Sequence, residues 1–556
     1  MRRLYTAEGE RLPDIPWEDY PRPQLARRDW LCLNGLWGLE HSGRREPVVV
    51  PFCPESLLSG IEDPPKCGEP MTYRRTFRIP EAWAGKRILL HFGAVSREAE
   101  VRVNGLRAAE HDNGYLAFSV DITEMLRPGE NELSVRAVND LDPRFPWGKQ
   151  KTERGGMWYT PVSGIWQTVW LEPVPERHIT GLDIKTDGRR AVITVGGIED
   201  GTALFEGREI PIRRGTAVIE VENPVLWCPE TPKLYRFTII SGEDRVESYF
   251  ALRTLSVAPD EKGLLRLFLN GKPFFFHGLL DQGWWSDGLY TPAAPELYER
   301  DILTAREFGY NTLRKHIKIE PERFYYDCDR LGMIVFQDMV NAGKYDFLRD
   351  TALPTLGLWR RDDRKLHTDP LQRRSFLFAM EGTVRQLGNH PCIVLWTIFN
   401  EGWGQFCADD AYDRLKALDP SRFIDTASGW FVPKKTDAES LHIYFRPPRL
   451  GKDRTRPQIL SEYGGYAFKL PAHSFNTEKT YGYRKYADAS GFESALLKLT
   501  EELIPLAERG LCAAVYTQLS DVEDETNGLV TFDRRESKIS PEKLRRAAEK
   551  LKNTVK

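Results

Sequence analysis

The chain has 556 residues, and its 78 Lys and Arg nearly balance its 81 Asp and Glu, which leaves a formal net charge of −3. This length allows three or four domains, each with a core of its own. The balanced charge argues against nucleic acid or an anionic membrane as a partner and favours a small or neutral substrate.

The cysteines and the N-terminus exclude further classes of protein. The eight cysteines form no Cys-x-x-Cys pair and have no His at ligand spacing, so we expect free thiols, no metal and no other cofactor. No apolar stretch follows the two N-terminal arginines, which predicts a cytoplasmic protein. Edge strands of β-sandwiches could pair subunits, so a homo-oligomer stays open.

The N-terminal third of the chain alternates short β-rich runs with turn signals. The runs include RRTFRIP, RILLHFGAV, AEVRVNG, NELSVRAV and IWQTVWLE, with NG, PGEN and DNG between them. This pattern predicts a β-sandwich of the jelly-roll type over residues 1–175. Residues 176–257 repeat the pattern on a smaller scale, which is typical of an immunoglobulin-like β-sandwich.

From residue 258 onward, short apolar runs alternate with segments of helical period, which indicates βα units. The runs lie at 274–282, 310–317, 333–339, 393–401, 423–430, 440–445, 458–465 and 511–521. Eight of them in about 300 residues predict a (β/α)8 TIM barrel over residues 258–556. A doubly wound open sheet is the alternative, but no Gly-rich phosphate loop follows any run.

Polar and aromatic residues close these apolar runs. Because the active site of a barrel lies at the C-terminal ends of its strands, we expect these residues to share one cup. The candidates are Asp281, Gln282, Arg314, His316, Asp338, Asn400, Glu401, Trp430, His442, Tyr444, Glu462, Tyr463 and Gln518. Trp284, beside the first run, adds an aromatic face suited to a sugar ring.

Two of these candidates are carboxylates on well-separated strands, Glu401 and Glu462. Two carboxyl groups that face each other across a sugar are the machinery of glycoside hydrolysis, one as proton donor and one as nucleophile or base. Either glutamate alone would more often be a surface group. His316 and His442 have no Ser or Cys partner for a triad and could equally be hydrogen-bonded wall residues.

An acidic run at Asp521, Glu523, Asp524 and Glu525 follows the eighth apolar run. We expect it to form the face of a loop. A calcium site is the alternative, although the run lacks regular ligand spacing.

The motifs in these segments resemble glycoside hydrolase family 2 over nearly the whole chain. LNGLWGLE and DNGYLAFSVDIT resemble that family's N-terminal sugar-binding domain, while IFNEGWGQ and LSEYGG resemble its acid/base and nucleophile motifs. The resemblance implies a retaining glycosidase with Glu462 as nucleophile, Glu401 as acid/base, and Asn400 as a contact to the sugar 2-hydroxyl. It also implies that Arg314 keeps Glu462 ionised.

Departures from the family leave the sugar open. β-Glucuronidases of the family have an Asn-x-Lys pair, whereas Asn527 is followed by Gly528 and Leu529. This argues against a typical glucuronidase, although Arg446, Lys479 or another base could substitute.

The eighth run has Tyr516, expected at the substrate, where many relatives have Trp. The expected function is exo-acting removal of a terminal sugar by double displacement through a covalent glycosyl-enzyme. The sugar could be a galactoside, a uronide or a furanoside. The alternatives are a carbohydrate-binding protein without catalysis and a transglycosylase that uses the same two glutamates.

Overall fold

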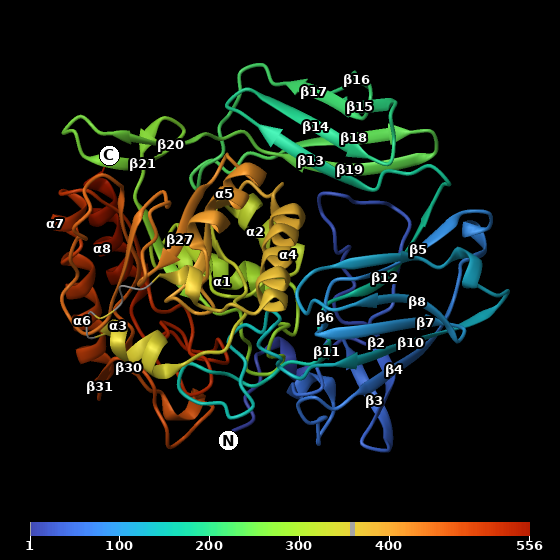
Figure 1. Cartoon of the computed structure of the whole chain (residues 1–556), viewed down its shortest axis with the longest axis horizontal. Helices are drawn as coiled ribbons and strands as arrows, with labels where there is room; N and C mark the ends of the chain where they lie inside the picture. The colour runs from blue at the N-terminus through green and yellow to red at the C-terminus, as the bar shows by residue number, and fades with distance from the viewer. Residues whose placement is uncertain (1, 356–357, 359–361, 556) are drawn as a thin grey trace.

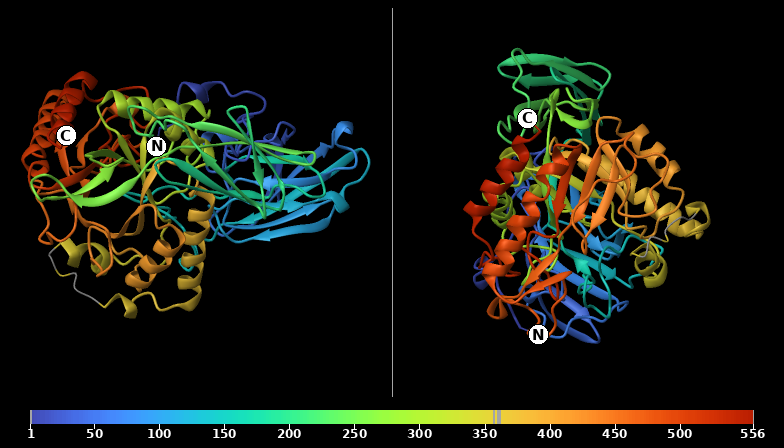
Figure 2. Two further views of the ribbon diagram at one scale, coloured as in Figure 1. Left: turned by 90° about the horizontal axis from the view of Figure 1, so that it is seen from above. Right: turned by 90° about the vertical axis from the view of Figure 1, so that its left-hand side faces the viewer.

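The computed structural model describes residues 2–355, 358 and 362–555. Two β-sandwiches accompany a barrel, which confirms the predicted fold class (Figure 1). The N-terminal sandwich, in blue, lies beside the barrel, and the middle sandwich, in green, lies above both in this view. Figure 2 shows from above how the N-terminal sandwich extends away from the barrel.

The N-terminal sandwich contains a six-stranded and a four-stranded antiparallel sheet. In β10 (Glu130–Val138), Leu133, Val135 and Ala137 are buried and the residues between them are more exposed, the period of two expected for a strand with one core face. The six-stranded sheet has the order β3 (Arg44–Val50), β2 (Gly35–His41), β4 (Met71–Arg78), β10, β7 (Glu98–Val103) and β8 (Leu106–His111). The four-stranded sheet has the order β1 (Leu31–Cys32), β12 (Val169–Val174), β5 (Arg87–Phe92) and β9 (Phe118–Asp121), and β6 (Val95–Ser96) pairs with β11 (Gly164–Ile165).

The middle sandwich consists of a three-stranded and a four-stranded sheet. Aromatic rings fill the space between them, with Tyr235 stacked on Phe250 at 5.4 Å between centroids. The strands are β13 (Gly181–Thr186), β14 (Arg190–Gly196) and β17 (Thr216–Glu220) in one sheet, and β16 (Arg208–Ile212), β15 (Gly201–Phe205), β18 (Tyr235–Ser241) and β19 (Asp244–Phe250) in the other. The predicted domain boundaries near residues 175 and 257 stay predictions.

Eight parallel strands form the barrel, one in each predicted run. Nearly all their residues are buried, as expected where helices cover one face and the barrel interior the other. The order is β27 (Phe423–Ser428), β26 (Ile393–Asn400), β25 (Ile334–Asp338), β24 (Thr312–Lys315), β23 (Phe276–Asp281), β32 (Leu511–Tyr516), β29 (Gln458–Tyr463) and β28 (Glu439–Ile443). No ladder joins β27 to β28 within the described residues, so the barrel is nearly closed.

Helices and further short strands complete the part of the chain that contains the barrel. The helices are α1 (Glu296–Glu307), α2 (Glu322–Leu331), α3 (Leu353–Thr355), α4 (Pro370–Leu387), α5 (Ala408–Leu418), α6 (Ala489–Glu501), α7 (Ile504–Ala507) and α8 (Pro541–Asn553). The short strands are β20 (Leu255–Pro259), β21 (Leu265–Leu269), β22 (Lys272–Pro273), β30 (Tyr466–Phe468) and β31 (Arg484–Tyr486). Within the described part of the chain, no helix combines the length and apolar character needed to cross a membrane.

The helical layer departs from the repeated βα pattern at one place. Residues 429–438 after β27 and 444–457 after β28, all of them described, contain no α-helix. Pro447, Pro448 and Gly451 explain the second gap, because proline removes a backbone donor and glycine disfavours helix. The second of these segments without a helix follows β28, which contains His442, and begins at Tyr444.

A buried ion network joins the two sandwiches. Arg27 donates to both oxygens of Asp244 at 2.9 Å, to Glu172 at 3.0 Å and to the carbonyl of Ile179 at 2.6 Å. Glu172 also accepts from Arg22 at 2.7 Å. Asp244, in contrast, has only one other donor in the described structure, the backbone N–H of Ile179 at 2.7 Å.

We expect Arg27→Met to lower the free energy of unfolding by about 3–5 kcal/mol, because the change leaves the Asp244 carboxylate buried with one hydrogen bond. Arg44→Met is the matched control: Arg44 and Asp63 form an exposed pair, so its loss should cost less than about 1 kcal/mol. Urea denaturation followed by tryptophan fluorescence measures both. Equal losses in the two variants would contradict the role given to Arg27.

Candidate active site

The floor of the barrel cup is organised by the guanidinium of Arg314, which is fully buried at the end of β24. It donates to Asp338 Oδ1 at 2.9 Å, to Asn400 Oδ1 at 2.9 Å and to Glu462 Oε1 at 3.1 Å. It also reaches the Ser428 hydroxyl and the Ser461 carbonyl, both at 3.0 Å. One cation therefore draws together the ends of β24, β25, β26, β27 and β29.

Glu462 is the more strongly anchored carboxylate. Besides Arg314, it accepts from the Tyr444 hydroxyl at 2.7 Å, and the Thr517 hydroxyl lies 3.4 Å from the same oxygen. Burial by itself favours the neutral acid, but the positive charges of His442 and Arg314 outweigh it and lower the pKa of Glu462 from 4.5 to about 2. Glu462 is therefore ionised at neutral pH.

Glu401 is held differently, just past the end of β26. Its backbone has φ +50°, a left-handed conformation that costs a non-glycine residue about 1 kcal/mol, and its N–H donates to the Ser428 carbonyl at 2.9 Å. Gly402 follows at φ +73°, where a Cβ would lie 2.3 Å from the ring of Phe431. The Glu-Gly sequence is thus needed to turn the Glu401 side chain into the cup.

His442 and Tyr444 lie between the two carboxylates. The Nδ1 of His442 is 2.7 Å from Glu401 Oε1, and its Nε2 is 3.6 Å from Glu462 Oε1. The Tyr444 hydroxyl is 3.3 Å from Glu401 Oε1 and 2.7 Å from Glu462 Oε2. Because one hydroxyl contacts both, Glu401 Oε1 and Glu462 Oε2 cannot be further apart than the sum of these two distances. That sum is below the minimum separation of ~6.5 Å between the carboxyl groups of inverting glycosidases.

A cavity opens above these groups, and six predicted residues line it. They are Gln282, His316, Asn400, Glu401, Tyr444 and Glu462. Leu280, at the end of the first apolar run, also lines it. Trp403, whose ring is also suited to the face of a sugar, lines it too. The remaining lining residues were not among the predicted contacts: Lys149, Met157, Tyr483, Thr517, Glu525 and Asn527.

Several predicted contacts lie beneath or beside the cavity. Asp338 bonds to Arg314 and, at 2.6 Å, to His316 Nδ1. Gln518 accepts from Gln282 at 2.8 Å and donates to Asn527 at 2.8 Å. The ring of Trp430 meets His442 edge to face at 5.8 Å. These residues can position the cavity wall without reaching a ligand.

Four predicted contacts belong to the protein interior. Asp281 forms an ion pair with Lys315 at 2.6 Å, and Trp284 packs between Tyr159 and Tyr290. Tyr463 and Tyr516 meet edge to face at 5.8 Å inside the hydrophobic core. Side chains alternate along a strand, so Tyr463 points outward from the barrel because its neighbour Glu462 points inward.

The acidic run is buried, so the expectation of an exposed loop face was wrong. Asp521 pairs with Lys538, and Glu523 accepts from the backbone N–H of Thr160 at 3.0 Å. Asp524 accepts from Asn476 at 2.8 Å, and Glu525 from Gln518 at 2.7 Å. Within the described residues, no group of three or more His, Cys, Asp or Glu could hold a metal ion.

The N-terminal domain supplies part of the cavity wall through residues 147–160. The Trp147 ring donates to the Gly343 carbonyl at 3.1 Å, and Trp158 packs on Trp403 at 5.2 Å between ring centroids. Lys149 and Met157 lie between these anchors and line the cavity. The only sequence signal was a stretch with three Gly and one Trp, GKQKTERGGMWY, whose position over a distant barrel could not be predicted from the sequence.

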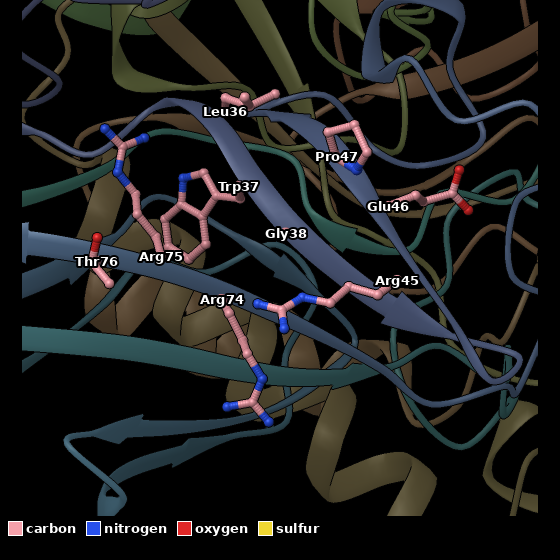
Figure 3. A pocket seen from close by; sticks show the side chains of 9 residues that line it. All are labelled: Leu36, Trp37, Gly38, Arg45, Glu46, Pro47, Arg74, Arg75 and Thr76. Atoms are coloured by element: carbon pink, nitrogen blue, oxygen red, sulfur yellow. The ribbon is translucent and has the colours of Figure 1, made fainter.

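A second pocket lies on the outer face of the N-terminal sandwich and shares no residue with the cavity (Figure 3). It is lined by Arg45, Arg74, Arg75 and neighbouring residues of β2, β3 and β4. Arg74 pairs with Glu40 and Glu132, both at 3.2 Å, so its charge is already balanced. Glu401 and Glu462 lie elsewhere, in the barrel.

Comparison with known proteins places the chain among glycoside hydrolases. Residues 66–158 match a family model described as a glycosyl hydrolase 2 galactose-binding domain-like, and residues 262–489 match the TIM barrel domain of glycosyl hydrolases family 2. A beta-galactosidase of Enterobacter cloacae is 27% identical over 473 residues, which are 75% of this chain and 42% of that protein. A putative beta-glucuronidase of Formosa agariphila is 25% identical over 392 residues, 63% of this chain and 43% of that protein.

The chain thus spans less than half the length of these two relatives. Solved structures match it more fully. A beta-D-glucuronidase of Dictyoglomus thermophilum has a TM-score of 0.74 at 18% identity, covering 95% of this chain and 98% of that one. A beta-galacturonidase from Eisenbergiella tayi, bound to galacturonate, has a TM-score of 0.71 at 19% identity, covering 95% and 99%. At this identity the structural likeness shows the fold.

The lowered pKa of Glu462 predicts a pH-dependent contribution to stability. Its ionised form stabilises the folded state fully above pH 4.5, and this contribution of a few kcal/mol is lost as the pH falls from 4.5 to about 2. As the pH falls through this window, we expect the unfolding free energy of wild type to decrease relative to that of Glu462→Gln. Urea denaturation at a series of pH values checks it, and a constant difference would contradict it.

Proposed function

The chain belongs to glycoside hydrolase family 2, and from this premise we propose that it is a retaining, exo-acting glycosidase that releases a terminal sugar by double displacement. The single observation that carries the proposal is the Tyr444 hydroxyl, which lies within 3.3 Å of Glu401 and 2.7 Å of Glu462. This spacing supports the short carboxylate separation of retaining enzymes over the wider one that inversion requires.

In the first step Glu462 attacks the anomeric carbon. Its low pKa keeps it ionised, and Arg314 fixes the oxygen that does not bond to Tyr444. Glu401 gives its proton to the departing glycosidic oxygen, so that the bond to the aglycone breaks as the bond to Glu462 forms.

The contacts of Tyr444 support this division of roles. The hydroxyl has one proton, and the shorter contact, with ionised Glu462, takes it. The hydroxyl is also 3.3 Å from Glu401 Oε1, so it lies between the two carboxyl groups. Burial and the neighbouring Glu462 raise the pKa of Tyr444 well above its usual value, so Tyr444 remains a donor.

In the second step Glu401, now a carboxylate, removes a proton from water as the water attacks the anomeric carbon and frees Glu462. Asn400 supports positioning of the sugar, because Arg314 and the Ser428 hydroxyl both bond its Oδ1 at 2.9 Å. Its amide nitrogen is left to donate to a sugar hydroxyl. Gln282 and His316 are further proposed contacts on the wall.

The walls of the cavity support action at a chain end. Lys149 and Met157 from the N-terminal domain and Glu525 and Asn527 from the segment after β32 line it opposite the strand ends. A cup with such walls accommodates a terminal sugar better than the middle of a polymer.

We expect Glu462→Gln to lower kcat by at least about 1,000-fold on every substrate, because the nucleophile is lost. Glu401→Gln should depend on the leaving group. A dinitrophenyl glycoside needs no proton, so the glycosyl-enzyme should form in a burst and then hydrolyse slowly. An alkyl glycoside should be almost unreacted. Stopped-flow release of the aglycone measures both.

The matched control for these two variants is Glu493→Gln on α6, away from the cavity, which should keep wild-type rates. Turnover by Glu462→Gln at the wild-type rate would rule out the mechanism. Binding of glycosides without any turnover by wild type would favour the non-catalytic alternative.

We expect Tyr444→Phe to shift the acid limb of kcat/KM upward by about one pH unit, because a hydrogen bond to ionised Glu462 is lost and its pKa rises. For wild type that limb should lie below about pH 4. Tyr483→Phe is the control. Its ring stacks on Tyr444 at 4.0 Å, and the change keeps the stack, so the limb should not move. An unmoved limb in Tyr444→Phe would contradict the contact.

A further inference from the structure

The ammonium of Lys149 is the feature of the cavity that the proposed mechanism leaves unused. The residue is only 6% exposed and lines the cavity from the N-terminal domain. Its backbone is fixed, because its carbonyl accepts from the N–H of Tyr159 at 2.9 Å. The Nζ lies 5.2 Å from the ring centre of Tyr159 and 5.9 Å from that of Trp403.

Lys149 has no hydrogen-bond acceptor or carboxylate partner for its ammonium in the described part of the chain. The two rings attract the cation, but aromatic faces do not replace the hydrogen bonds that water would supply. The other buried lysines of the barrel are all satisfied: Lys315 and Lys318 each bond to Glu320, and Lys538 to Asp521. An ammonium that lines a cavity without such a partner is free to bind an acceptor from a ligand.

The charges around Lys149 decide which acceptor fits. Glu462 is neutralised by Arg314. Glu525 is close enough to interact with Lys149 electrostatically, but it forms no ion pair with it. Burial raises the pKa of Glu525, with Lys149 and the Gln518 hydrogen bond acting in the opposite direction. Lys149 is therefore a positive charge on this wall without an ion-paired counter-charge.

We propose that Lys149 binds a carboxylate on the terminal sugar, which makes the substrates of this site glycosides of a uronic acid. The inference rests on the proposed function and specifies its substrate class. A sugar carboxylate would give the ammonium a charge-assisted hydrogen bond and a counter-charge, whereas a sugar hydroxyl would supply no counter-charge. Lys149 and Glu462 line the same cavity, so the carboxylate and the anomeric carbon can belong to one ring.

Two pairs of aryl glycosides test the inference, since the members of each pair differ at C6 alone. They are the β-glucuronide with the β-glucoside and the β-galacturonide with the β-galactoside. We expect wild type to favour the uronide of at least one pair. Lys149→Met should lower kcat/KM for that uronide by about 10- to 100-fold and change the neutral partner less than about threefold.

Lys151→Met is the matched control. Lys151 lies two residues away, is exposed, and has its Nζ 5.5 Å from the ring centre of Trp158, so it shares the loop without lining the cavity. It should leave the ratio of uronide to neutral glycoside unchanged. Methionine keeps the hydrocarbon stem between Tyr159 and Trp403. If circular dichroism shows that Lys149→Met is unfolded, Lys149→Gln takes its place.

A wild type that prefers the neutral member of both pairs would overturn the inference, as would equal losses on both members in Lys149→Met. Failure of the proposed function is distinguishable, because then no glycoside would show turnover that Glu462→Gln abolishes. In that event the melting temperature with free glucuronate or galacturonate decides. If the free sugar raises the melting temperature of wild type and Lys151→Met but not that of Lys149→Met, the inference is supported. An equal change of melting temperature in all three proteins overturns it.

Discussion

The arrangement of the barrel cup depends on one buried cation. The Arg314 guanidinium has no route to water, so its charge must be matched by acceptors from the protein, and these come from Asp338, Asn400, Ser428, Ser461 and Glu462. Asp338 and Glu462 supply the counter-charges, and a buried cation left without any would cost about 3–5 kcal/mol. The same requirement that holds the strand ends together therefore fixes the two acids on either side of His442 and Tyr444.

The two glutamates are held by opposite means. Glu462 lies within a regular strand and forms an ion pair with the Arg314 guanidinium, which helps to keep it ionised. Glu401 lies past its strand in a left-handed conformation that the neighbouring glycines permit, and its partners are an imidazole and a phenol. Local backbone strain is common at functional sites, and the packing of the surrounding core compensates for its cost.

The cup is also a product of two domains. The barrel provides the carboxylates, while residues 147–160 of the N-terminal sandwich close one side and bring Lys149 to it. Glu523 ties this segment to the barrel by accepting from Thr160. Substitutions in a sandwich that looks accessory can therefore change the wall of the proposed sugar-binding cavity without touching Glu401 or Glu462.

The amino-acid pattern alone determined the fold class, all eight barrel strands and the two carboxylates, because strand-end positions in a barrel converge whatever the loops do. It placed Gln282, His316, Asn400 and Tyr444 on the cavity for the same reason. It was wrong on the acidic run, whose burial depends on donors from Lys538, Thr160 and Asn476 far away in the chain. Only the tertiary structure decided that Tyr463 and Tyr516 pack against each other in the core, and that Lys149 reaches the cavity. Contacts between domains leave no periodic trace in the sequence, so the residue that we infer selects the sugar could be found only after folding brought it there.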